Sequence, residues 1–161
     1  MTDEPFVLAT ALVSRNSYVN LGTANEIAAQ RLHNVAWVAA NDDARARAVI
    51  TATALLNRLR WQGRPIAPTQ PLAWPRVAER CPPGCPLSVE TPPAIVTVTV
   101  ELAIHLLGTG EPSGAPVQQR VPGDSLVMYF PTIADEFPKH VRRLIEPFLV
   151  VSSANVAEIR L

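Results

Sequence analysis

The stretch that decides the fold covers residues 41–63 and has the sequence NDDARARAVITATALLNRLRWQG. Its apolar residues recur at the spacing of one helix face, and they are Val49, Ala52, Leu56 and Leu59. Asn41 or Asp42 can cap a helix here, and the acidic pair suits the positive end of the helix dipole. Gly63 is a typical helix terminator, and Pro65 prevents the helix from resuming. The pattern predicts one long helix that ends near Gly63.

Four arginines lie off the apolar face of this helix, and they are Arg45, Arg47, Arg58 and Arg60. Together they could form a basic face for nucleic acid. Arg45, however, stands three residues after Asp42, and Arg47 stands four residues after Asp43. Oppositely charged side chains at such helical spacing pair with each other. The sequence therefore predicts intrahelical ion pairs that neutralise much of this charge.

A shorter helix is predicted to precede the long one. Thr23 and Glu26 have the spacing of a capping box, in which each side chain accepts from a free backbone N–H near the other residue. Ile27 and Leu32 would give this helix its apolar side, and it would end near residues 33–34. Trp37 follows, and we expect it to be packed against the body.

A third helix is predicted over residues 91–108, TPPAIVTVTVELAIHLLG, with Thr91 as cap and Pro92 in the first turn. Apolar residues form two stripes along it: Ile95, Val98, Leu102 and Leu106, and Val96, Val100, Ala103 and Leu107. Only a narrow polar line remains, at Thr97, Glu101 and His105. A helix that is apolar on two sides lies centrally in a core, or is half buried by another chain.

The rest of the chain predicts smaller elements. Two strands are expected at 116–121 and 125–130, and a short helix starts at Pro138 with Val141, Leu144 and Ile145 as its apolar residues. The predicted fold is mainly α: a bundle of about four helices, a small β-hairpin near 116–130, and extended arms at both ends. Residues 1–149 would form one domain, and 150–161 an extended C-terminal arm.

Composition limits the classes of function. The chain has 161 residues, which is about one domain, and 14 basic residues balance 14 acidic ones. Zero net charge argues against a large electrostatic footprint on nucleic acid. No apolar run approaches about 18 residues, and the acidic start differs from a signal peptide, so neither a membrane span nor a leader is expected.

Neither a metal centre nor an enzyme is expected. Cys81 and Cys85 frame the sequence CPPGC, but zinc needs two further ligands. The three histidines, His33, His105 and His140, are isolated in sequence. Phosphate-binding loops, nucleophile elbows and metalloprotease motifs are lacking. The cysteines are therefore interpreted as a turn with two thiols, and no cofactor is predicted.

The segment after the long helix, residues 60–76, has the unusual sequence RWQGRPIAPTQPLAWPR. It holds two of the three Trp residues of the chain, in a segment too rich in proline for a helix. Prolines fix an extended form, and Trp and Arg are enriched at interface hot spots. We therefore interpret residues 62–93 as a docking loop, with Trp61 facing the core and Trp74 nearer a partner. The alternative is that both Trp residues form a lid on the protein's own helices.

The order of these elements resembles a family of tailed-phage and prophage proteins that carries the label DnaT-like single-stranded-DNA-binding protein. It also resembles the head–tail connector, or adaptor, proteins that form a ring beneath the phage portal. The resemblance covers about residues 16–107. Its most specific parts are the segments SYVNLGTAN, WQG and QPLAWPR, at Tyr18, Val19, Ala24, Trp61, Gly63, Gln70, Leu72, Trp74, Pro75 and Arg76.

The adaptor resemblance implies a structural protein of the virion neck, assembled in the host cytoplasm. Its partners would be the portal protein, further copies of itself (twelve, by portal symmetry) and a tail or second neck protein. Double-stranded DNA would pass through the ring without sequence-specific contact. The alternative is a phage single-stranded-DNA-binding protein of replication. The residues predicted to bind partners are Trp61, Gln70, Trp74, Arg76, Val150, Val151, Val156, Ile159 and Leu161.

Overall fold

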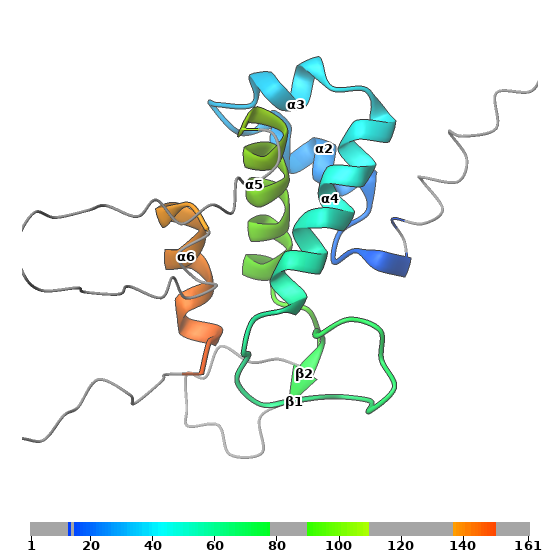
Figure 1. Ribbon diagram of the computed structural model, residues 1–161, viewed down its shortest axis with the longest axis vertical. Coiled ribbons are helices and arrows are strands. Elements are labelled where there is room, and N and C mark those ends of the chain that lie inside the picture. The colour runs from blue at the N-terminus through cyan, green and yellow to red at the C-terminus, as the bar shows by residue number, and fades with distance from the viewer. Residues whose placement is uncertain (1–12, 14, 78–89, 110–136, 151–161) are drawn as a thin grey trace, which may run out of the picture.

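A computed structural model describes residues 13, 15–77, 90–109 and 137–150, and these residues form a mainly helical body (Figure 1). The elements are α2 (Leu21–Ala29), α3 (Val35–Ala39), α4 (Asp42–Asn57), β1 (Arg64–Pro65), β2 (Arg76–Val77), α5 (Pro93–Thr109), α6 (Lys139–Ile145) and the 3₁₀ helix η2 (Glu146–Phe148). The mainly α fold is thus confirmed. The hairpin predicted near 116–130 and most of both predicted arms lie outside the described residues. No helix within the described ranges is long and apolar enough to cross a membrane.

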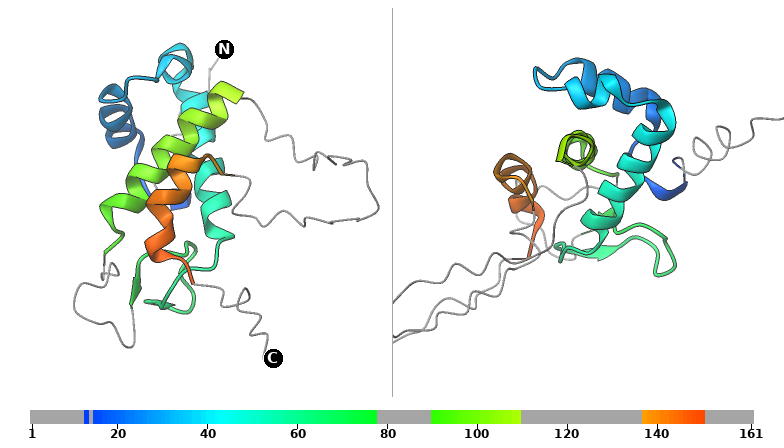
Figure 2. Two further views of the ribbon diagram at one scale, coloured as in Figure 1. Left: turned by 90° about the vertical axis from the view of Figure 1, so that its left-hand side faces the viewer. Right: turned by 45° about the horizontal axis from the view of Figure 1, so that its top comes forward.

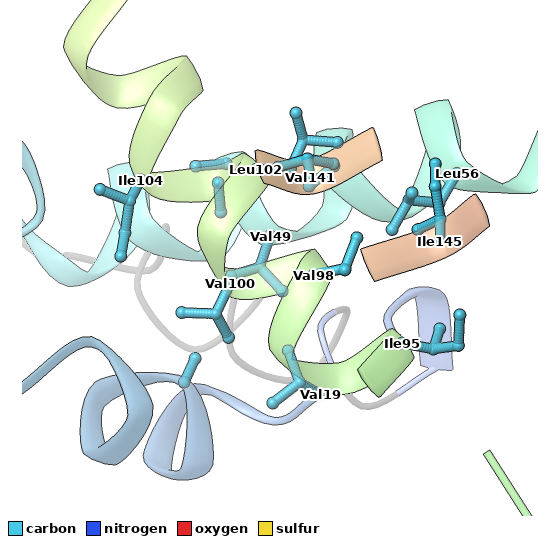
Figure 3. Packing of buried hydrophobic residues seen from close by; sticks show 14 of the residues in the cluster. Val19, Val49, Leu56, Ile95, Val98, Val100, Leu102, Ile104, Val141 and Ile145 are labelled. Carbon is cyan, nitrogen blue, oxygen red and sulfur yellow. The ribbon is translucent and has the colours of Figure 1, made fainter. Parts of the chain in front are cut away.

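Helix α5 is the centre of the body. It packs against α2, α3, α4 and α6, and Figures 1 and 2 show it between α4 on one side and α6 on the other. Its buried residues are Ile95, Val98, Thr99, Val100, Leu102, Ala103 and Ile104. Figure 3 shows several of them facing Val49 of α4 and Val141 of α6. The hydroxyl of Thr99 donates to the carbonyl of Ile95 at 2.8 Å, so its burial leaves no unpaired donor. The two predicted apolar stripes therefore do place this helix in the core.

Helix α4 begins as predicted and ends earlier. The side chain of Asn41 accepts from the backbone N–H of Ala44 at 2.8 Å, which is the expected cap. The helix ends at Asn57, six residues before Gly63, so the predicted end is wrong. The indole of Trp61 donates to the carbonyl of Leu56 at 3.0 Å, an acceptor that a continuing helix would give to a backbone N–H. The folded loop therefore terminates the helix.

Helix α2 starts two residues before the predicted position. Asn20 is its cap and accepts from the N–H of Thr23 at 2.8 Å, so the capping box at Thr23 is wrong. The helix ends at Ala29, and Leu32, expected on its apolar side, is 87% exposed. Leu32 is exposed because it follows the helix end and no longer shares its buried face.

Helix α3 was not predicted, although the packing of Trp37 was. Trp37 is 3% exposed, and its indole donates to the side chain of Asn25 at 3.0 Å. Helix α6 starts directly after Pro138, as predicted, and buries Val141. Ile145 is also fully buried, whereas Leu144, the third apolar residue named for this helix, is 39% exposed.

Candidate interaction surfaces

The tryptophan loop, residues 58–77, leaves the end of α4 and returns to it through a small sheet. Gly63 has φ 70, a left-handed conformation that glycine adopts without a Cβ clash. The two strands then pair antiparallel, with Arg64 opposite Val77 and Pro65 opposite Arg76. The prolines therefore belong to a closed loop whose ends are held together.

Three aromatic side chains form the centre of the tryptophan loop. The rings of Trp61 and Trp74 meet edge to face, with centroids 5.6 Å apart, and Trp74 meets Phe148 of η2 in the same way at 5.7 Å. Such geometry is favourable because the positive edge of one ring meets the negative face of the other. Exposed fractions are 5%, 2% and 6% respectively. The cluster fastens the loop to the C-terminal helical segment.

Arg76 lies inside the loop as a cross-link between backbone carbonyls. Its guanidinium donates to the carbonyls of Gln62 at 2.8 Å, Gly63 at 2.6 Å and Ala73 at 3.1 Å. Burial lowers the pKa of Arg76 below its ordinary value, and the neighbouring Tyr18 opposes this shift. The rigid planar fork of the guanidinium directs its donors to several diverging carbonyls at once. Arg76 therefore stabilises the loop.

Asn57 connects the loop to the N-terminal segment. Its side-chain oxygen accepts from the hydroxyl of Tyr18 and from the backbone N–H of Ala73, the latter at 2.9 Å. Burial raises the pKa of Tyr18 to about 12, against the effects of the loop backbone at Trp74 and Ala73 and of the charge on Arg76. The hydroxyl is therefore a neutral donor at physiological pH.

Gln70 cross-links backbone groups at the tip of the tryptophan loop. Its amide nitrogen donates to the carbonyls of Leu72 at 2.7 Å and Pro75 at 3.0 Å, and its oxygen accepts from the N–H of Ala67 at 3.1 Å. One side chain thus holds both sides of the turn between the prolines. The side chain of Gln70 is therefore engaged within its own chain.

The structure brings together four of the predicted partner-binding residues, Trp61, Gln70, Trp74 and Arg76, in one intramolecular cluster. The lid alternative describes this geometry, because the side chains point into the loop and onto α4 and η2. Trp61 and Trp74 are both buried, at 5% and 2% exposed, so the expected difference between them is not seen in the monomer. Direct partner contact by these four side chains stays a prediction.

The predicted C-terminal arm begins on the tryptophan loop of its own chain. The N–H of Val150 donates to the carbonyl of Arg60 at 3.0 Å, and the N–H of Gln62 donates to the carbonyl of Phe148 at 2.8 Å. The side chain of Val150 is 52% exposed. The other predicted arm residues, Val151, Val156, Ile159 and Leu161, lie outside the described residues.

A surface that the sequence did not indicate lies at the opposite end of the body from β1 and β2 (Figure 1). This surface, called here the α3 corner, consists of Leu32, Val35 and Val38, which are 87%, 77% and 64% exposed. Residues 32–40 contain no Asp, Glu, Lys or Arg. Exposed apolar residues gathered in one uncharged segment of the chain are typical of a protein contact. Its signal was the three-residue spacing of these side chains, but α3 is too short to predict from periodicity.

The charged residues near the α3 corner are paired. Arg45 binds Asp42 at 3.0 Å, and Arg47 binds Asp43, which confirms the predicted intrahelical pairs. Arg45 also donates to the carbonyl of Trp37 at 2.9 Å. Arg45 therefore holds the start of α4 against α3, and the charge of each arginine is balanced by a neighbouring carboxylate.

The histidines do not form a metal centre within the described part of the chain. No group of three or more His, Cys, Asp or Glu side chains there could hold a metal ion, and Cys81 and Cys85 lie outside it. Burial, assisted by the charge of His140, lowers the pKa of His105. His140 also lies 3.8 Å from Glu101, which binds Arg31 at 2.6 Å. These residues connect α2, α5 and α6.

Comparison with known proteins identifies the family. Residues 8–155 match the family described as "Putative DnaT-like ssDNA binding protein", so the chain belongs to that family. Neither the curated proteins nor the solved structures contain a significant match.

Proposed function

We propose that the chain is a structural protein of a phage virion neck: a head–tail adaptor that forms a ring beneath the portal and contacts the tail or a second neck protein. The observation that carries this proposal is the α3 corner, where Leu32, Val35 and Val38 of one short segment are all exposed. Leaving three large apolar side chains in water is unfavourable, and covering them with protein would remove that cost. An assembly protein needs such a surface.

The aromatic residues favour a protein partner over a single strand of nucleic acid. Proteins that bind single strands without sequence preference stack the bases on aromatic side chains. Among the described residues, Trp37, Trp61, Trp74, Phe137 and Phe148 are buried, and Tyr18 is half-buried and bonded to Asn57. The described body therefore offers no aromatic platform for stacking.

A test of this proposal is the composition of the virion. Purified phage particles should contain the chain as a stoichiometric neck component, detected by quantitative mass spectrometry and located by cryo-microscopy. Portal and tail proteins of the same particles provide internal standards for the copy number. A chain that is abundant in infected cells and absent from particles would refute the adaptor function.

A second candidate function is single-stranded-DNA binding in replication, which the family description names. Exposed basic side chains on the described body favour it. Exposed cations include Arg58, Arg60, Lys139 and Arg143. Phosphate contacts by such residues would give binding that weakens with salt.

Binding to a labelled oligonucleotide distinguishes the two functions. The adaptor proposal predicts only weak binding that disappears at physiological salt. An Arg58→Gln, Arg60→Gln double variant should reduce any residual binding, with Thr51→Gln on the exposed surface of α4 as the matched control. Micromolar or tighter binding at physiological salt, lost in the double variant, would favour the replication function.

A further inference from the structure

We propose that residues 1–12, called here the N-terminal arm, fold back into a pocket on the tryptophan loop of their own chain. This pocket, called here the loop pocket, has a volume of about 560 Å³. Its volume lies within the range of about 300–1,000 Å³ that is typical of binding sites. The inference does not rest on the proposed function, because it concerns a contact within one chain.

The loop pocket combines an apolar lining with positive charge. Its apolar lining comes from several parts of the tryptophan loop, and the residues are Leu59, Pro65, Pro71 and Leu72. Arg60 and Arg76 also line it, and the side chain of Arg60 is exposed. The tryptophan loop as a whole contains four Arg and no Asp, Glu or Lys. An occupant that complements this pocket therefore carries both carboxylates and large apolar side chains.

The N-terminal arm has that composition. Its sequence is MTDEPFVLATAL, with Asp3 and Glu4 as its acids and no Lys or Arg. Pro5 favours an extended backbone at Glu4, so the acids and the following apolar residues form one extended stretch. The carboxylates pair with the exposed guanidinium of Arg60, and Phe6 with its neighbours covers the apolar lining.

The arm joins the described body close to the loop pocket. Val13, the first described residue, is 1% exposed and belongs to the core. Shortly after it, the hydroxyl of Tyr18 donates to the side chain of Asn57, and Asn57 itself lines the pocket. At about 3.3 Å per residue, the stretch from Phe6 to Val13 spans up to about 23 Å. The arm is therefore long enough to reach the lining.

The tether favours the arm over an occupant from another molecule. A short flexible tether gives its segment an effective concentration in the millimolar range, which a second copy in dilute solution does not match. A single strand of nucleic acid would supply phosphates for Arg60, but its bases would need aromatic side chains on which to stack. Among the described residues the lining offers one such side chain, Trp61, and it is 5% exposed.

Paramagnetic relaxation in the full-length chain tests where the arm lies. A nitroxide is attached at Thr2→Cys, next to the two carboxylates, in a Cys81→Ser, Cys85→Ser background. The backbone amide signals of Leu59 and Leu72 should broaden in the NMR spectrum. The signals of α3, which lies at the opposite end of the body from β1 and β2, should stay sharp. Circular dichroism verifies that the labelled chain is folded.

Charge reversal shows whether ion pairing holds the arm. Arg60→Glu keeps the backbone carbonyl that accepts from Val150. It should weaken docking about 5-fold, because an attraction between exposed charges becomes a repulsion. Asp3→Lys combined with Glu4→Lys should have the same effect, and all three changes together should restore most of the broadening. Lys139→Glu, at an exposed cation outside the loop pocket, is the matched control and should leave the broadening unchanged.

Four results would overturn the proposal. One is a labelled parent chain in which α3 broadens as strongly as the loop pocket, or in which neither broadens. Another is unchanged broadening in Arg60→Glu. A mixture of spin-labelled chain with isotope-labelled chain that carries no nitroxide should show no broadening, and broadening there would assign the pocket to the arm of a second copy. Broadening that appears only after truncation following Val150 would show that residues 151–161 fill the pocket instead.

Discussion

Replacement of Trp74 by alanine should destabilise the isolated monomer. Trp74 is 2% exposed and lies between the rings of Trp61 and Phe148. Removing a buried indole loses its transfer free energy and leaves a cavity, which costs about 3–5 kcal/mol. For a chain of this size each kcal/mol lowers the melting temperature by about 2–4 °C. The variant should therefore melt roughly 6–20 °C below the parent chain in a calorimetric or circular dichroism experiment.

A pair of conservative variants shows whether the cluster has the described hydrogen bonds. The indole N–H of Trp61 donates to the carbonyl of Leu56, whereas the buried indole N–H of Trp74 has no hydrogen-bond partner among the described residues. Trp61→Phe therefore removes a hydrogen bond and Trp74→Phe does not. The first should cost about 1 kcal/mol more free energy of unfolding than the second, the net worth of one hydrogen bond, since the Leu56 carbonyl keeps the backbone N–H of Leu59 at 3.2 Å. Equal costs would contradict the assigned orientations of the two rings.

The result that would refute the reasoning is a Trp74→Ala monomer with unchanged melting temperature. If that monomer also failed to assemble, Trp74 would be an interface anchor, as hot-spot composition suggests. If it assembled normally, neither role would hold. A large loss of stability in the monomer, measured without any partner, identifies the side chain as part of the protein's own core.

Three further predictions concern the same body and its neighbouring segment. Arg76→Met should destabilise the monomer by about 3–5 kcal/mol in urea unfolding because it leaves several loop carbonyls without donors, and Arg76→Lys should restore little; a cost below 1 kcal/mol would contradict the cross-link. Tyr18 has its pKa raised from 10.0 to about 12, so the unfolded chain ionises first and stability should fall as pH rises from about 10 to about 12. Tyr18→Phe should flatten that part of the pH profile, and an unchanged slope would assign it to other groups. The Cys81→Ser, Cys85→Ser variant should assemble normally, and stoichiometric zinc in the parent chain would contradict this prediction.

Local signals in the sequence predicted what local contacts determine. Asn41 caps α4 through a hydrogen bond three residues away, and such a bond is visible in the sequence. The two stripes of α5 indicated its central place because burial on both sides needs apolar residues on both sides. The start of α2 was misplaced because Asn20 and Thr23 are both good caps, and only the path of the preceding chain selects between them.

Contacts between distant segments determined what the sequence could not predict. The end of α4 depends on Trp61 folding back to Leu56, and the burial of Trp74 depends on Phe148, which belongs to a different helical segment. The α3 corner was missed because five residues are too few for a periodic signal and its exposure depends on Trp37 turning inward. The residue types, Trp and Arg, indicated side chains that can make strong contacts. Only their burial in the structure shows that these contacts are made within the chain itself.

Because burial and residue type differ in what they indicate, the residues available to assemble the proposed ring are not those that the sequence suggested. Trp61, Trp74 and Arg76 have the side chains most typical of interface hot spots, yet their burial makes the tryptophan loop rigid before any partner arrives. The exposed candidates are smaller, with Val35 and Val150 as examples, so a single contact between two copies should be weak. A closed ring changes this outcome, because the last copy makes two contacts at once and the second is effectively intramolecular. Weak contacts of this kind keep the chains separate until a template such as a portal gathers them. If the tryptophans were on the surface instead, they would promote aggregation of the free chain.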